Sequence, residues 1–149
     1  MKIKVITSYK PGTWNDYAKR AVDSVLEHWP ADTDVAVYHE AQAQDVFDHP
    51  RVQWLDVHEV QPALLDFKNK HKDDPVANGE IEEIPNGVRR PGPMPTKGSF
   101  QWNAVRFANK VFCVTHALKN SPGYDYVIWL DADTYSFRPM PKDFLEQLL

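Results

Sequence analysis

Short apolar runs alternate with amphipathic segments along this sequence, and this alternation limits the possible folds more than any other feature. The apolar runs, which are rich in β-branched residues, occupy residues 2–8, 34–39, 52–58 and 126–130. Apolar residues with helical spacing separate the first two runs, and a longer helical pattern precedes the last one. Strands that alternate with helices predict right-handed crossovers and a mainly parallel sheet. We therefore expect an α/β fold, a Rossmann-like three-layer sandwich with helices on both faces of the sheet.

Turn and capping residues predict where the helices begin and end. Residues 9–12, Tyr-Lys-Pro-Gly, have the composition of a turn. Thr13 and Asp16 have the spacing of a capping box at the start of the first helix, which should end before Pro30. Ser99 is the predicted N-cap of the long helix that precedes the last strand.

The middle of the sequence is less regular. A helical turn is expected around residues 46–47, and a helix is expected from Pro62 to about residue 72. Residues 75–98 lose periodicity and are dense in proline and glycine, so we expect a long mobile loop there. The chain of 149 residues is 42% hydrophobic, which suits one domain with a single core over residues 1–149.

Charge and cysteine content argue against several classes of partner. A formal net charge of −4 and a pI near 5.8 do not suit a surface that neutralises nucleic-acid backbones or anionic lipids. No segment approaches the roughly 20 apolar residues that a membrane span requires. The one cysteine, Cys113, has no intramolecular disulfide partner, which is typical of a reducing compartment. We expect a cytoplasmic protein with no nucleic-acid partner and no membrane span.

Two aspartates directly follow the last apolar run. Asp131 and Asp133 are one residue apart, so in an extended chain they point to the same side with Cα atoms roughly 6–7 Å apart. A hard cation such as Mg²⁺ or Mn²⁺ would compensate both charges and keep positions open for water or phosphate. The small Ala132 between them would let a ligand come close. The same tripeptide also fits a turn that ends a core strand, because aspartate is common there.

The segment VIWLDADTYSFRPMPKDFLEQLL, preceded by VRFANKVFCVTHAL, resembles the donor-binding half of metal-dependent, nucleotide-sugar glycosyltransferases of the GT-A fold. This resemblance implies a GT-A type sheet, a nucleoside diphosphate sugar as donor, an unidentified acceptor, and Mn²⁺ or Mg²⁺ as cofactor. It implies that Asp133 is a direct metal ligand and that Asp131 contacts the metal, a bound water or the donor ribose. The metal would stabilise negative charge on the nucleoside diphosphate.

The resemblance also implies a phosphate-binding role for cations near the aspartates. Arg106 and Lys110 are four residues apart on the predicted long helix, so they share a face and can reach one anion. The same pair also fits an ordinary solvated helix face. Arg89, Arg90 and Lys97 in the proline-rich loop are weaker candidates for the same role.

The ends of the first two strands supply the other positions that the resemblance implies. Thr7, Ser8 and Tyr9 lie where the nucleotide base is expected, and the Tyr9 ring could stack on it. His39 and Glu40 end the second strand, where Glu40 would meet the base or the ribose, whereas His39 is interpreted mainly as a structural residue. Ala132 is also an expected donor-binding position, because its small side chain would let the donor come close to the two aspartates. The resemblance does not identify a catalytic residue.

Two other interpretations stay open. LDADT also resembles the hhhDxDxT motif of haloacid-dehalogenase-type phosphatases, in which Asp131 would be the nucleophile and Asp133 the general acid and base. Those enzymes need a lysine and an acidic pair later in the chain. The third interpretation is a truncated, non-catalytic binding module, because we expect the acceptor half to be absent from these 149 residues. The terminal FLEQLL would then form an amphipathic helix that self-associates or binds a partner.

Overall fold

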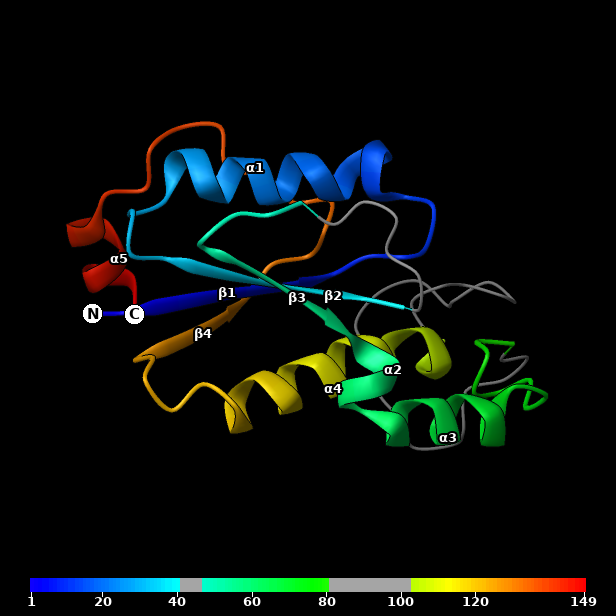
Figure 1. Cartoon of the computed structure of the whole chain (residues 1–149). Coiled ribbons are helices and arrows are strands. Elements are labelled where there is room, and N and C mark those ends of the chain that lie inside the picture. Colours follow the sequence, from blue (N-terminus) through cyan, green and yellow to red (C-terminus); the bar gives the residue numbers. More distant parts are fainter. Residues whose placement is uncertain (41–46, 81–102) are drawn as a thin grey trace, which may run out of the picture.

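The computed structural model describes residues 1–40, 47–80 and 103–149, and within them four parallel strands form one sheet (Figure 1). The strands are β1 (Ile3–Ser8), β2 (Asp34–His39), β3 (Val52–Asp56) and β4 (Tyr126–Trp129). Their order in the sheet is β3-β2-β1-β4, and every pairing is parallel. The predicted α/β class and the parallel sheet are therefore confirmed. The chain moves outward from β1 to β2 and β3, and then returns to place β4 on the other side of β1.

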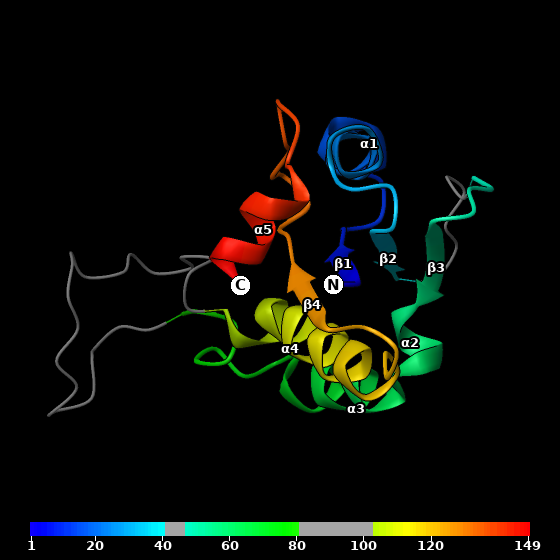
Figure 2. The ribbon, with the colours of Figure 1, turned by 90° about the vertical axis from the view of Figure 1, so that its left-hand side faces the viewer.

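Helices cover both faces of this sheet, as Figures 1 and 2 show. One face carries a π-helical turn, η1 (Trp14–Ala18), and the helix that continues it, α1 (Lys19–His28). The other face carries, within the described residues, the helices α2 (Val57–Val60), α3 (Pro62–His71) and α4 (Ala104–Lys119). The result is three layers compatible with a Rossmann-like sandwich. None of the described helices is both long enough and apolar enough to cross a membrane.

The pleat of the strands sends alternate side chains into two cores. Val5 and Val37 pack on the α1 side, whereas Ile6 and Tyr38 pack on the α4 side. All four are buried, as strands that are covered on both faces require. This alternation decides which strand-end side chains face α4.

The last helix, α5 (Lys142–Leu148), lies beside the two termini (Figure 1). Leu145 is only 1% exposed and joins the core on the α1 side, and burial of one leucine side chain stabilises a fold by roughly 1.5–3 kcal/mol. Phe144 and Leu148 on the same short helix are exposed. The helix predicted from FLEQLL is thus present, and self-association through it stays a prediction.

The capping box predicted at the start of the first helix is wrong. Thr13 precedes η1, but its side chain makes no capping hydrogen bond. Its hydroxyl instead donates to the carbonyl of Lys10 at 2.6 Å and lies 2.8 Å from the hydroxyl of Tyr17. The predicted partner Asp16 is an exposed residue of the π-helical turn. The turn at residues 9–12 is confirmed by Gly12, which has a positive φ of 81°.

Strand β3 ends two residues earlier than the pattern at residues 52–58 predicts. Asp56 is the N-cap of α2, because its side chain accepts a hydrogen bond of 2.9 Å from the backbone of His58. The helical turn expected around residues 46–47 is not found at Phe47, and Val46 lies outside the described residues. The helix predicted from Pro62 is confirmed and ends at His71.

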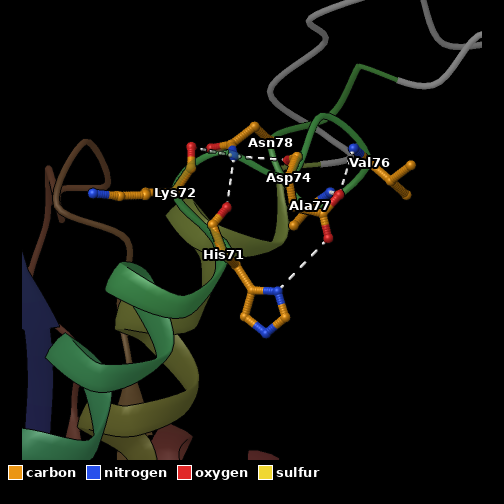
Figure 3. A network of polar contacts seen from close by, with 6 residues as sticks. All are labelled: His71, Lys72, Asp74, Val76, Ala77 and Asn78. Atoms are coloured by element: carbon orange, nitrogen blue, oxygen red, sulfur yellow. Dashed lines mark hydrogen bonds and ion pairs between the residues drawn. The ribbon is translucent and has the colours of Figure 1, made fainter.

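A hydrogen-bonded turn follows α3 (Figure 3). The sequence predicts a loop without regular structure from residue 75 onwards, so this turn is a difference. Asn78 donates from its amide to three backbone carbonyls, those of His71, Lys72 and Asp74. Asp74 accepts from the backbone of Val76 and Ala77. Residues 75–80 are therefore ordered by asparagine and aspartate side chains. The remainder of the expected loop lies outside the described residues, together with its candidates Arg89, Arg90 and Lys97.

The start of α4 is tied to this turn. Asn103 is the observed N-cap, and its side chain accepts a hydrogen bond of 2.7 Å from the backbone of Arg106. Its amide also donates to the carbonyl of Asn78 at 3.2 Å, and the two residues form an isolated bridge. Ser99, the predicted cap, lies outside the described residues. Asn103 therefore fixes the first turn of the helix that carries the predicted cations.

Candidate functional site

A cleft of about 730 Å³ lies at the carboxyl edge of the sheet, between the ends of three strands and α4. The strands that reach it are β1, β2 and β4, with the loop after β1 forming one wall. The strand order reverses at this point, because β2 and β4 lie on opposite sides of β1. In open parallel α/β sheets this reversal opens the crevice in which ligands bind. The cleft therefore occupies the position that the fold makes available for a ligand.

Among the described residues, the cleft brings together the predicted site residues except Thr7 and His39. The lining includes Ser8, Tyr9, Glu40, Arg106, Lys110, Asp131, Ala132 and Asp133. Thr7 is buried and is not part of the lining. Because side chains alternate along β1, Thr7 falls on the side of Val5, which faces α1, whereas Ser8 falls on the side of Ile6, which faces α4.

Asp131 is held by two donors that act on the same oxygen. The indole nitrogen of Trp129 donates to Oδ1 at 2.6 Å, and the ammonium of Lys110 lies 3.3 Å from that atom. The Trp129 hydrogen bond, followed by the Lys110 ammonium, holds the pKa of Asp131 below its ordinary value, and partial burial opposes this effect. The side chain of Asp131 is 60% exposed. The structure thus presents an ionised carboxylate to the cleft at neutral pH.

Asp133 completes the acidic pair at the same wall. The backbone of Thr134 donates to the carbonyl of Asp131 at 2.8 Å, which closes a turn immediately after the strand. Ala132 is buried in the core on the α1 side, whereas Asp133 is exposed and lines the cleft. The small residue between the aspartates therefore anchors the turn, and both acids stay at the cleft.

The donor set of this wall fits some metal ions and not others. Among residues 1–40, 47–80 and 103–149, no group of three or more His, Cys, Asp or Glu side chains is placed to hold a metal ion. A zinc site, which usually takes three or four protein ligands, is not formed by these residues. Mg²⁺ and related ions bind through one or two carboxylates and complete their coordination with water and substrate phosphate. Asp131 and Asp133 fit that second pattern.

Glu40, at the end of β2, is bound by side chains that the sequence did not indicate. Its Oε1 accepts from the amide of Asn109 at 3.1 Å, and its Oε2 lies 2.9 Å from the ammonium of Lys68. His58 contributes a ring nitrogen 3.6 Å from Oε2. The Glu40 side chain is 25% exposed, so this acid is fixed between three helices while still lining the cleft.

Tyr9 and Ser8 form the β1 end of the cleft. The Tyr9 ring is buried and packs on Trp14 with ring centroids 5.2 Å apart, so most of its surface belongs to the core. Ser8 lines the cleft, and burial, followed by the nearby Glu40 carboxylate, raises the pKa of the Cys113 thiol to about 12. Cys113 therefore contributes a neutral thiol to the cleft floor. His39 lies outside the lining and packs beside Trp54, with ring centroids 6.4 Å apart.

Arg106 and Lys110 both line the cleft, as their spacing on one helix predicts. Sequence reasoning missed two further lining residues with clear roles, Trp129 and Asn109. Both had a recognisable spacing: Trp129 precedes Asp131 by two residues on the same strand edge, and Asn109 follows Arg106 by three on the same helix face. What the spacing could not show was which acid each would contact.

No family model matches the chain, and the comparisons with curated proteins and with solved structures found no match either.

Proposed function

We propose that this cleft binds a nucleoside diphosphate sugar together with Mn²⁺ or Mg²⁺, and that the protein serves glycosyl transfer as the donor-binding portion of a GT-A type transferase. The observation that carries the proposal is the cleft at the point of strand reversal, where Asp131, Asp133, Arg106 and Lys110 lie on adjoining walls. Acids and cations around one cleft suit a ligand that combines a divalent cation with a diphosphate.

Each wall has a separate task in this proposal. Asp131 and Asp133 hold the metal ion, and Arg106 and Lys110 pair with phosphate oxygens. Glu40 offers its remaining acceptor positions to the ribose or the base. When bound, the metal ion supplies Lewis-acid stabilisation of the charge on the diphosphate. The proposal concerns binding of the donor, and it assigns to none of the described residues the role of a base that activates the acceptor.

The phosphatase interpretation receives less support. Its motif, hhhDxDxT, requires threonine two positions after the second aspartate, but this sequence has Tyr135 there and Thr134 one position earlier. In addition, the carboxylate of Asp131 already accepts from Trp129 and Lys110. A nucleophilic carboxylate would lose reactivity through these contacts.

Titration calorimetry with uridine and guanosine diphosphates, each with and without Mn²⁺, tests the proposal. We expect binding that requires Mn²⁺ and that weakens at least about 100-fold in Asp133→Ala, because a metal ligand is lost. Asp143→Ala is the matched control, since Asp143 is an acid of α5 that does not line the cleft. It should bind like the unaltered protein.

Two outcomes would contradict the proposal. If nucleotide binding depended neither on Mn²⁺ nor on the Asp133 carboxylate, the site would not be a metal site. Hydrolysis of a simple phosphomonoester that is lost in Asp131→Asn would instead favour the phosphatase interpretation.

A further inference from the structure

Three side chains meet at the β4 end of the cleft in a way that the metal proposal alone does not explain. Trp129 and Lys110 both contact Oδ1 of Asp131, and the Lys110 ammonium also lies over the Trp129 ring, 5.2 Å from its centroid. Neither contact involves Oδ2. The carboxylate is therefore oriented through one oxygen while the other is not used by these two partners.

The two donors differ in a property that matters for a cation. The indole N–H of Trp129 is neutral, so it can orient the carboxylate and still leave its negative charge available. The Lys110 ammonium carries a positive charge and compensates the carboxylate itself. A divalent ion on Asp131 would repel that ammonium, whereas it would not repel the indole.

We propose that Lys110 is a displaceable counter-ion: it pairs with Asp131 when the cleft is empty and moves to the diphosphate when metal and nucleotide bind, while Trp129 keeps Asp131 in position in both states. This inference rests on the proposed function of the cleft. Lys110 is suited to the exchange because its side chain is 43% exposed and its flexible stem carries a compact charge. Trp129 is suited to the fixed part because it belongs to β4 and packs in the α4-side core.

The inference predicts effects of opposite sign for a single substitution. Lys110→Met removes the ammonium and keeps a stem of similar length, so Mn²⁺ alone should bind more tightly, by about 3- to 10-fold, since its competitor is gone. In the same variant, uridine or guanosine diphosphate should bind more weakly at saturating Mn²⁺, by about 10-fold, since a phosphate contact is lost. A residue that only stabilised the fold would weaken both.

Trp129 should behave differently. Trp129→Phe keeps an aromatic ring in the core and removes only the indole donor, so Mn²⁺ binding should weaken by about 10-fold with or without nucleotide, as expected for a group that orients a metal ligand. The variant should also lose any change in tryptophan fluorescence that Mn²⁺ causes in the unaltered protein.

The test measures Mn²⁺ binding to the full chain by electron paramagnetic resonance, followed by diphosphate binding at saturating Mn²⁺. Lys119→Met is the matched control, because Lys119 is an exposed cation at the far end of the same helix. It should change neither affinity. Circular dichroism and thermal unfolding confirm that each variant is folded, and the Lys110 result stands even if Trp129→Phe does not fold.

The outcomes separate this inference from the proposed function. If the unaltered protein binds Mn²⁺ through Asp133 but Lys110→Met leaves that affinity unchanged or weaker, the exchange of Lys110 is wrong and the metal site stands. If the unaltered protein binds no Mn²⁺ with or without nucleotide, the proposed function fails and the inference fails with it.

Discussion

Two acids at opposite ends of the cleft, Glu40 and Asp131, differ in how their carboxylate oxygens are contacted. Glu40, after β2, has both carboxylate oxygens engaged, one by Asn109 and the other by Lys68. Asp131, after β4, has its contacts concentrated on one oxygen and is more exposed, at 60% against 25% for Glu40. The first acid is largely satisfied within the protein, and the second is oriented by Trp129 and Lys110 through Oδ1 alone.

Helix α4 makes this difference with two successive residues. Asn109 reaches Glu40, and Lys110 reaches Asp131. A neutral amide and a mobile ammonium thus serve the two acids from one rigid element. Under the proposed function, a metal ion is therefore expected at Asp131 and not at Glu40, because both oxygens of Glu40 already have partners.

The largest expected effect separates the two acids by metal affinity. Asp131→Asn should weaken Mn²⁺ binding by about 100-fold, because it neutralises an oriented carboxylate, whereas Glu40→Gln should leave it nearly unchanged. Electron paramagnetic resonance of free Mn²⁺ measures both. Equal losses in the two variants would mean that the ends of the cleft do not differ as described.

The next effect concerns the free energy of unfolding. Here the larger loss is expected at Glu40 and the smaller one at Asp131, because stability should depend more on the partner of Glu40. Lys68→Met leaves a partly buried carboxylate without its ammonium and should lower the free energy of unfolding by about 1–3 kcal/mol. Lys110→Met, beside an exposed acid, should cost less than about 1 kcal/mol. Urea denaturation measures both, and Lys70→Met is the control on the same helix as Lys68. A larger loss for Lys110→Met would contradict the comparison.

A smaller loss of stability is expected when the N-cap of α4 is removed, and it should affect Glu40 and Asp131 equally. Asn103→Ala removes the N-cap of α4 and should cost about 1 kcal/mol of unfolding free energy. Asn103→Asp keeps the capping acceptor and should recover most of that loss. Since the whole helix is affected, neither acid should lose its partner selectively. Thermal unfolding together with Mn²⁺ titration checks this, and a selective loss at one end would show that the first turn positions Asn109 and Lys110 unequally.

The smallest effect concerns the thiol on the cleft floor. The Glu40 carboxylate is one of the causes that raise the pKa of Cys113 to about 12, so Glu40→Gln should lower that pKa while Asp131→Asn leaves it unchanged. Ultraviolet absorbance of the thiolate as a function of pH follows the change. An equal shift in both variants would mean that Cys113 senses both ends of the cleft.

Most of the layer architecture could be predicted from the sequence, because apolar periodicity is a local property of each segment. The failures lie at element ends, where one side chain decides the outcome. Thr13 was expected to cap a helix, but its hydroxyl is used by Lys10 and Tyr17. The pattern at residues 52–58 predicts a strand that reaches His58, but Asp56 is its last residue, because this side chain caps α2 and ends the strand.

The sequence predicts which residues form the candidate site, but it does not predict which of them contact one another. Parallel strands place their carboxyl ends at one edge, so Ser8, Glu40 and Asp131 could be expected together. Lys68 and His58 could not, since both lie on helices far from Glu40 in sequence and reach it only through the packing of α2 and α3. Thr7 is a different case, because strand alternation alone turns its side chain away from the cleft.

The most direct test of the central claim is anomalous diffraction from a crystal grown or soaked with Mn²⁺ and a nucleoside diphosphate. We predict one manganese ion in contact with the carboxylates of Asp131 and Asp133, with Lys110 on the phosphates and Glu40 still bound to Lys68. An empty cleft in which both aspartates extend into solvent, or manganese held by Glu40 instead, would contradict the claim.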